Sequence, residues 1–370
     1  MNAASSSEGK RSVDTSAVRI GALIPLSRPG WVEAGRHLLS GLELGVCDIN
    51  RAGGIIGRPL ELLVRDTAAD PQRAIAVVDE LDSLGVAALA GEYHSVVARA
   101  VASRADSIGL PFLCSSAVLD ALTDQPTNWV ARLAPMQSYG WQVYADFLIN
   151  AGHARIAVAV EPSAYWASGI RILRDYLGPR GGDVIELDMR TLSPVALCDE
   201  LASIRTKTLL LLVGYPEPAI SIVESVRRDS RLAGVTIGAP AGQPEFGGWT
   251  TQQQVAGTAI PFLRYLPERL GSLGVRVQAA LRERLGEAPS FVAFEGYDTI
   301  AALAEAMRSH GTGRARIAES WSSIAVDGTR GIISFSRVTG TGVWQWARPP
   351  VQVVDRDPAS PDSFRIRYAR

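Results

Sequence analysis

The sequence predicts an α/β protein with two doubly wound parallel-sheet lobes joined by a three-crossing hinge. Short apolar segments alternate with longer segments of helical periodicity along most of the 370 residues. This alternation runs in two successive series, separated by a polar, proline-containing stretch at 123–135. Such alternation is typical of right-handed β-α-β units around a parallel sheet. Two series therefore indicate two lobes.

The first series begins after a Ser- and Ala-rich segment, 1–17, which we expect to be a disordered tail. Apolar residues at helical spacing follow the first strand, and Gly53 and Gly54 end that helix. Pro71 fits the first turn of the next helix. The predicted strands are 19–24, 60–64, 86–90 and 111–114, and the predicted helices are 31–50, 71–84 and 95–107.

The second series has the same pattern. Its predicted strands are 155–160, 184–187, 208–213 and 235–237, and its predicted helices are 137–151, 167–177, 194–204 and 218–228. Two later helices, 268–285 and 290–308, come without a strand series, so we expect them to pack on the first lobe.

The tail from Gly331 alternates apolar and polar residues, which predicts extended strands near the second lobe. The chain would then cross between lobes near 132–136, 261–265 and 326–332. The resulting division assigns 18–133 plus 263–328 to an N-terminal lobe, and 134–262 plus 329–370 to a C-terminal lobe.

Composition excludes several classes of function. The 37 basic and 38 acidic residues are scattered, so no basic face indicates nucleic acid or an anionic membrane as partner. No apolar run approaches the roughly 20 residues of a membrane helix.

The three cysteines and four histidines lack the spacing of a metal site or disulfide framework, and we expect no metal and no cofactor. The N-terminal segment lacks the apolar stretch of a secretory signal, which predicts a cytoplasmic protein.

Several motifs together resemble a known family. They are IGALIPLS at 20–27, the run at 41–74, GEYHS at 91–95, PFLCSSA at 111–117, RLAP at 132–135, GYPEP at 214–218 and FEGYDT at 294–299. With them the chain resembles the type I periplasmic-binding-protein fold, in the Leu/Ile/Val- and amide-binding branch of ABC-transporter substrate-binding proteins. The resemblance implies a small ligand between two hinged lobes. Parallel sheets independently place ligands outside the carboxyl ends of their strands.

The first lobe offers candidates after three strands. Ser95 stands where the family binds an anion, at a predicted helix N-terminus; the alternative is that it only caps the helix. His94 lines the pocket or is solvated on its loop. Ser115 and Ser116 follow the strand at 111–114, with ordinary turn polarity as the alternative. The family often closes the cleft with residues after the first strand, here Ser27 and Trp31, although Trp31 could instead anchor the core.

The second lobe offers aromatic candidates and an ambiguous acid. The resemblance implies that Tyr165, Trp166 and Tyr215 face the ligand. It also places an acid for a ligand ammonium in 238–246, at a position that falls on Ala241 or Glu245. If it falls on Ala241, an amide, urea or aromatic acid is favoured over a free amino acid. The Tyr297 and Asp298 pair in FEGYDT is better explained by lobe packing and hinge support.

No catalytic motif emerges from the sequence. Residues 311–313 lack the third glycine and the strand of a dinucleotide site, and no P-loop or nucleophile elbow occurs. We therefore predict a non-catalytic protein that closes on an amino acid, amide, urea or aromatic acid and acts as a cytoplasmic sensor through a regulatory protein partner.

Two alternatives stay open. One is an exported component of an ABC importer that delivers its ligand to a permease. The other is an enzyme of a specialised biosynthetic pathway, with Glu245 or His94 as acid or base. A homodimer is also left open.

Overall fold

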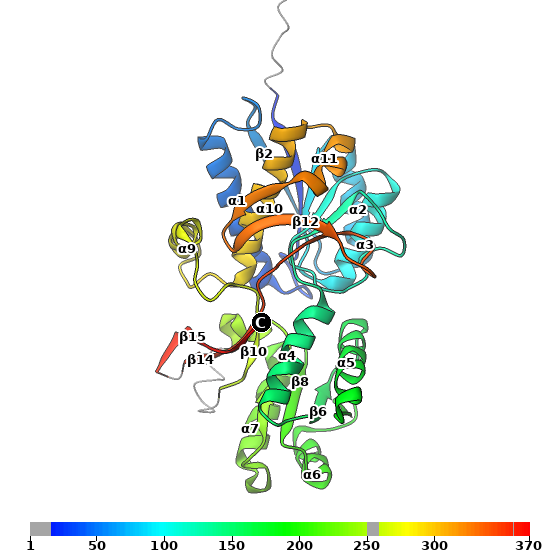
Figure 1. Cartoon of the computed structure of the whole chain (residues 1–370), viewed down its shortest axis with the longest axis vertical. Helices are drawn as coiled ribbons and strands as arrows, with labels where there is room; N and C mark the ends of the chain where they lie inside the picture. Colours follow the sequence, from blue (N-terminus) through cyan, green and yellow to red (C-terminus); the bar gives the residue numbers. More distant parts are fainter. Residues whose placement is uncertain (1–15, 250–258, 358) are drawn as a thin grey trace, which may run out of the picture.

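The computed structural model describes residues 16–249, 259–357 and 359–370. Two α/β lobes lie one above the other along the long axis of the molecule (Figure 1). The expected tail, 1–17, falls largely outside the described residues, and the first strand begins at Val18, one residue before the predicted strand at 19–24.

The first lobe contains an eight-stranded sheet with the order β11-β12-β13-β5-β4-β3-β1-β2. Its strands are β1 Val18–Ile24, β2 Leu60–Asp66, β3 Ala88–Gly91, β4 Phe112–Cys114, β5 Val130–Arg132, β11 Ala325–Gly328, β12 Gly331–Arg337 and β13 Trp344–Trp346. Strands β1 to β5 are parallel, as predicted for a doubly wound sheet. The sequence reasoning missed β5 and β11, which are only three and four residues long.

Helices cover both faces of this sheet. They are α1 Val32–Arg51, α2 Pro71–Ser83, α3 Ser95–Ser107, α9 Ser272–Leu285, α10 Phe291–His310 and α11 Arg314–Ser320. The prediction that the late helices pack on the first lobe is confirmed, because α9 and α10 both contact α1. Glycine permits the closest approach: a Cβ added at Gly41 of α1 would lie 1.9 Å from the carbonyl oxygen of Ala293 in α10.

The second lobe contains a parallel four-stranded sheet with the order β7-β6-β8-β9. Its strands are β6 Arg155–Val160, β7 Asp183–Asp188, β8 Thr208–Leu212 and β9 Thr236–Gly238, and its helices are α4 Gln137–Asn150, α5 Ala164–Leu177, α6 Pro194–Ile204 and α7 Pro216–Arg228. Every residue of β8 is buried, as expected for a central strand that is covered on both faces. Short 3₁₀ helices occur at Gly178–Arg180, Ser230–Leu232, Gln243–Glu245, Gly247–Trp249 and Trp321–Ser323.

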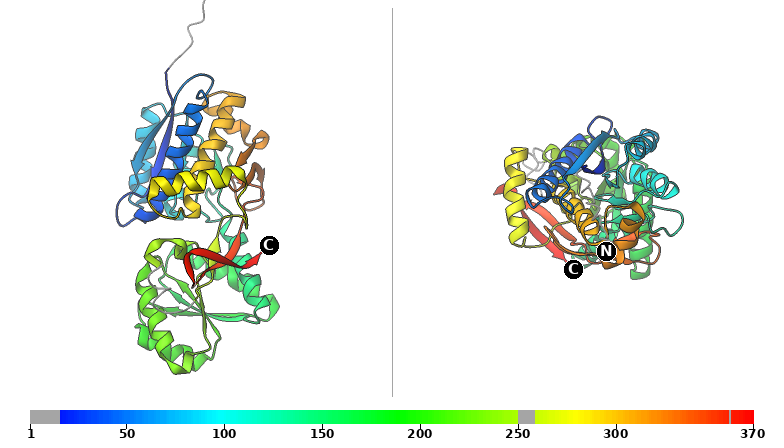
Figure 2. Two further views of the ribbon diagram at one scale, coloured as in Figure 1. Left: turned by 90° about the vertical axis from the view of Figure 1, so that its left-hand side faces the viewer. Right: turned by 90° about the horizontal axis from the view of Figure 1, so that it is seen from above.

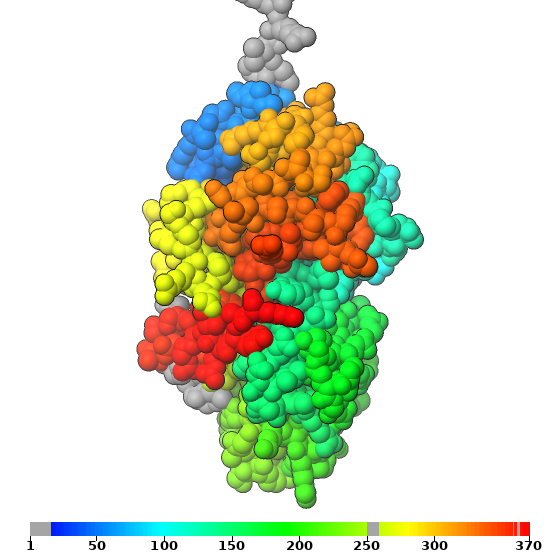
Figure 3. Space-filling view, viewed as in Figure 1, coloured from blue at the N-terminus to red at the C-terminus, as the bar shows by residue number. Residues whose placement is uncertain are grey.

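A third, antiparallel sheet lies beside the second lobe. It pairs β10 Phe262–Arg264 with β14 Gln352–Asp357, and β14 with β15 Ser360–Ala369. All three strands contact α4 of the second lobe. These C-terminal strands lie at the level where the lobes meet (Figures 2 and 3).

The expected assignment of 329–370 to the C-terminal lobe is wrong for β12 and β13. Strand β13 pairs in parallel with β5, with Trp344 opposite Ala131, so both strands extend the first sheet. The last crossing therefore lies at 347–351 and not at 326–332, while the others lie at 133–136 and 265–271. Alternating polarity predicts a strand that is buried on one side, but it does not say which sheet edge accepts that strand.

Within the described ranges, no helix combines the length and the apolar character that crossing a bilayer requires. Cys47, Cys114 and Cys198 are all free thiols.

Candidate ligand-binding cleft

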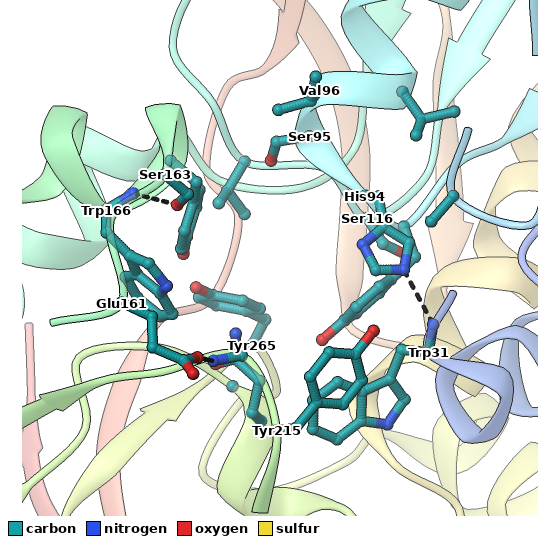
Figure 4. A pocket seen from close by; sticks show the side chains of 18 of the residues that line it. Trp31, His94, Ser95, Val96, Ser116, Glu161, Ser163, Trp166, Tyr215 and Tyr265 are labelled. Atoms are coloured by element: carbon teal, nitrogen blue, oxygen red, sulfur yellow. Dashed lines mark hydrogen bonds between the residues drawn. The ribbon is translucent and has the colours of Figure 1, made fainter. Parts of the chain in front are cut away.

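A cleft of about 410 Å³ lies between the two lobes (Figure 4). Its lining residues are Trp31, Ala69, Tyr93, His94, Ser95, Val96, Val97, Ser116, Val118, Glu161, Pro162, Ser163, Tyr165, Trp166, Gly214, Tyr215, Gly242, Gln243, Tyr265 and Phe291. Most of them follow the carboxyl end of a parallel strand in one of the two sheets. This is where doubly wound sheets place ligands. Both lobes therefore contribute walls through the same feature of the fold.

Ser95 is the first residue of α3, and its hydroxyl points into the cleft (Figure 4). Its Oγ accepts a hydrogen bond from the Leu119 N–H at 3.3 Å, which leaves its proton available. The positive end of the helix dipole lies at the same place, so this end of the cleft favours an anion or a carbonyl oxygen.

Ser115 and Ser116 follow β4 but have different surroundings. Ser116 lines the cleft, is 5% exposed and has no hydrogen-bond partner among the described residues. Ser115 does not line the cleft: its Oγ accepts a hydrogen bond from Thr299 Oγ1 at 2.9 Å, on α10. The expectation of ligand contact at Ser115 is therefore corrected, because α10 already uses its hydroxyl.

His94 and Trp31 form one wall of the first lobe. His94 Nε2 accepts a hydrogen bond from the Trp31 N–H at 3.0 Å. Burial lowers the pKa of His94 to about 4, so the imidazole is neutral near neutral pH and can keep this acceptor role. His94 thus holds the loop that carries Trp31, and both residues line the cleft.

The second lobe contributes the predicted aromatic residues. Tyr165 and Trp166 lie in the first turn of α5, which begins three residues before the predicted start of the helix. Their ring centroids are 4.7 Å apart, and Ser163 Oγ caps the helix by accepting from the Trp166 N–H at 3.2 Å. Tyr215 lies opposite Trp31 at the boundary between the lobes, and its ring stacks on the Trp31 indole.

Ser27 and Glu245 do not line the cleft, and both predicted roles are corrected. The Ser27 hydroxyl donates to Asp66 Oδ2 at 2.5 Å and thereby ties the end of β1 to the end of β2. The Glu245 carboxylate is buried, pairs with Arg264 Nε at 3.1 Å and accepts from the Phe291 N–H at 3.1 Å. Ala241 is buried and does not line the cleft either. Neither candidate for the ammonium-binding position faces a ligand.

The sequence reasoning missed Tyr93, Glu161, Gln243, Tyr265 and Phe291 as lining residues. Glu161 is the lining residue with an ionisable carboxyl, and its Oε2 accepts from the Gly214 N–H at 3.4 Å. It follows β6 directly, so the strand-end rule could have identified it. Tyr265 directly follows β10, a three-residue strand that the sequence did not predict, and Phe291 begins α10, so no predicted strand end marks either of them.

The structure does not favour Glu245 or His94 in the acid–base role that the enzyme alternative assigned to them. Glu245 is engaged in a buried ion pair away from the cleft, and His94 Nε2 is occupied by the Trp31 N–H. A general base needs a free lone pair within reach of the substrate proton. The lone pair of His94 Nε2 is already used, and Glu245, whose Oε2 has no hydrogen-bond partner among the described residues, does not line the cleft.

Comparison with known proteins identifies the family. The sequence profile described as "Periplasmic binding protein" matches residues 17–348. The chain belongs to this family. A Leu/Ile/Val-binding protein homolog 7 from Brucella melitensis is 29% identical over 178 residues, which span 45% of this chain and 44% of the relative. The match thus covers less than half of that relative's length.

Solved structures show the same fold. A leucine-binding protein from Thermotoga maritima superposes with a TM-score of 0.77 at 20% identity, over 95% of this chain and 97% of that one. A branched-chain amino acid binding protein from Streptococcus pneumoniae in complex with isoleucine superposes with a TM-score of 0.79 at 18% identity, over 95% of this chain and 99% of that one. A solute-binding protein from Rhodopseudomonas palustris in complex with 3,4-dihydroxybenzoic acid superposes with a TM-score of 0.79 at 15% identity, over 96% of this chain and 97% of that one. The predicted family resemblance and type I fold are confirmed.

Proposed function

We propose that the protein is the ligand-binding component of an ABC importer and encloses one small molecule by hinge closure. The observation that carries this proposal is the cleft itself, whose walls come from the strand ends of both lobes. A ligand there gains its full set of contacts only when the lobes are closed. Ligand binding therefore shifts the population of molecules towards the closed state.

The cleft suits a ligand with a hydrogen-bond-accepting end and an apolar or aromatic body. Ser95 and Ser116 can donate to a carboxylate or amide carbonyl. Trp31, Tyr165 and Tyr215 offer ring surfaces for the body. Isoleucine and 3,4-dihydroxybenzoic acid, the ligands of two proteins with this fold, both meet this description.

The comparisons favour the importer over the cytoplasmic sensor that the sequence predicted. The curated relatives are Leu/Ile/Val-binding proteins, and several proteins with this fold are solute-binding proteins of ABC transporters. We therefore propose an extracytoplasmic location and a permease as partner; a regulatory partner and a homodimer are not required. Fractionation of cells that express the natural gene tests this. Recovery of the protein in the cytoplasmic fraction would contradict the importer proposal and support the cytoplasmic sensor instead.

Calorimetric titration of the purified chain tests ligand binding. The probes are leucine, isoleucine, benzoate, 3,4-dihydroxybenzoate, acetamide and urea. We expect at least one carboxylate or amide to bind, and Ser95→Ala to weaken that probe about tenfold, as for loss of one hydrogen bond to a charged group. Ser107→Ala, at the exposed end of the same helix, is the matched control. Absence of binding by every probe, or equal affinity in Ser95→Ala, would contradict the proposal.

A further inference from the structure

Glu161 places a carboxylate on the second-lobe wall of the cleft. It directly follows β6, and its backbone N–H donates to the carbonyl oxygen of Leu212, the last residue of β8, at 3.1 Å. Its side chain is half-buried and lines the cleft (Figure 4). The ends of two neighbouring strands therefore fix the position from which this carboxylate enters the cleft.

The protein uses little of the hydrogen-bonding capacity of the Glu161 carboxylate. Oε2 accepts from the Gly214 N–H at 3.4 Å, which is long for an N–H···O hydrogen bond. Among the residues that the structure describes, no donor reaches Oε1, and no arginine, lysine or histidine pairs with Glu161. An ionised carboxyl group offers about four lone-pair positions, so most of them are open to a ligand.

The rest of the cleft supplies no positive charge to balance Glu161. The lining residues that the structure describes include no lysine and no arginine. The imidazole of His94 is neutral near neutral pH, because burial lowers its pKa to about 4. A carboxylate that is partly removed from water without a partner is unfavourable. A positively charged group of a ligand would supply that partner.

The first-lobe wall has the opposite preference and lies apart from Glu161. Ser95 and Ser116 favour a carboxylate or carbonyl oxygen there, together with the N-terminus of α3. Figure 4 shows the Ser95 hydroxyl and the Glu161 carboxylate on different walls, with Tyr265 between them in this view. The cleft volume of about 410 Å³ is within the range of pockets that hold drug-sized ligands, roughly 300–1,000 Å³. The cleft thus has room for an elongated ligand.

We propose that Glu161 binds an ammonium group at the end of the ligand remote from the end that Ser95 and Ser116 bind. The ligand is then an elongated molecule with a carboxylate or amide carbonyl at one end, an apolar body, and an ammonium at the other end. In an α-amino acid both charged groups are attached to one carbon, so it does not span the two walls. The inference rests on the proposed function and narrows its ligand class.

This assignment differs from the one that the family resemblance implied. The resemblance placed the acid for an ammonium in 238–246, but neither Ala241 nor Glu245 lines the cleft. Glu161 comes from a different strand end of the second lobe. A ligand that is bound by both walls makes its full set of contacts only in the closed state, so its ammonium also favours closure.

Pairs of probes that differ in the amino group test the inference. The remote pairs are 4-(aminomethyl)benzoate with 4-methylbenzoate, and 6-aminohexanoate with hexanoate; isoleucine with 3-methylpentanoate is the α-amino pair. All are titrated calorimetrically near neutral pH. In at least one remote pair, the ammonium member should bind wild type roughly ten- to hundredfold more tightly, as expected for a hydrogen bond between charged groups. Equal or weaker binding of the ammonium member in both remote pairs would overturn the inference without any variant.

Glu161→Gln removes the charge but keeps the side-chain length and an acceptor oxygen for the Gly214 N–H. It should bind the ammonium member of the preferred remote pair about tenfold more weakly or worse, and the other member as tightly as wild type. Glu186→Gln is the matched control: it removes an acid of β7 in the same lobe that pairs with Arg174 and does not line the cleft. This control should bind both members like wild type.

The remaining outcomes separate the inference from the proposed function. A remote-ammonium preference that persists in Glu161→Gln would overturn the inference, and so would loss of an α-ammonium preference in that variant. Binding of benzoate, acetamide or urea, with no preference for a remote ammonium, would overturn the inference and leave the proposed function intact. Failure of every probe to bind would instead contradict the proposed function.

Discussion

The Trp31 indole lies parallel to the Tyr215 phenol ring, with ring centroids 5.1 Å apart and an angle of 6° between the planes. Trp31 belongs to the first lobe and Tyr215 to the second, and both line the cleft. The Tyr215 hydroxyl also donates to the carbonyl oxygen of Pro29, across the same boundary. The two lobes are therefore joined directly at the cleft, in addition to the three chain crossings.

Trp31→Ala should speed ligand release. An aromatic pair contributes about 0.5–1.5 kcal/mol beyond its buried area, which corresponds to roughly two- to tenfold in the closing equilibrium. Stopped-flow measurement of probe dissociation gives the rate. Tyr215→Phe is the matched control, because it retains the stack and loses only the bond to Pro29; its rate should change less. Equal dissociation rates in wild type and Trp31→Ala would mean that the stack does not hold the lobes closed.

Glu33 forms a second bridge between the lobes. Its Oε1, on α1, accepts from the Gly247 N–H of the second lobe at 2.7 Å. Glu33→Ala should shift the ligand-free protein towards the open state by about fivefold, as expected for one hydrogen bond of about 1 kcal/mol. The radius of gyration from small-angle X-ray scattering should then increase.

Two variants of the same helix calibrate this measurement. Glu33→Gln keeps an acceptor oxygen and should stay closer to wild type. Glu43→Ala removes an acid of α1 that pairs with Arg284 of α9, within the first lobe, and should leave the radius unchanged. If Glu43→Ala expands the protein as much as Glu33→Ala, the effect is one of helix charge and not of the bridge to Gly247.

The strand–helix alternation was sufficient to predict both parallel sheets, because a strand that is buried on both faces has a distinctive composition. The candidate residues came from the family resemblance together with the rule that ligands lie at the ends of parallel strands, and seven of the ten line the cleft. The failures have a common cause. Ser27 and Ser115 were predicted from residue type and position, but Asp66 and Thr299, both distant in sequence, already bind their hydroxyls. Competition between partners that are distant in sequence cannot be read from a local motif.

His94 should make the protein less stable in mild acid. Burial lowers its pKa from 6.5 to about 4, so between these values the folded state binds fewer protons than the unfolded state. The contribution of neutral His94 to the free energy of unfolding is therefore fully present above about pH 6.5. As the pH falls from there towards 4, the free energy of unfolding decreases by about 3 kcal/mol in total. Burial also lowers the pKa of His37, which adds a contribution of the same sign.

The histidine contribution is measured by urea unfolding between pH 4 and pH 7. His94→Gln can still accept from the Trp31 N–H but does not titrate, so its stability should decline less than that of wild type over this range. His310→Gln, which removes a histidine that bonds Ser323 at the surface, is the control for loss of a histidine. If the free energy of unfolding falls equally with pH in wild type and in His94→Gln, His94 is not the source of the acid sensitivity.

Glu245 should prove structural, because its carboxylate is paired with Arg264 in the interior and also accepts the Phe291 N–H. Removing one partner leaves an uncompensated buried charge, so Glu245→Ala should cost about 3–5 kcal/mol in urea unfolding. The double variant Glu245→Ala, Arg264→Ala should be less destabilised than the sum of the two single variants, because neither charge is then left alone. Strict additivity would mean that the pair is not coupled. A Glu245→Ala protein of wild-type stability that no longer binds amino acids would restore this acid as the ammonium partner that the family resemblance implied.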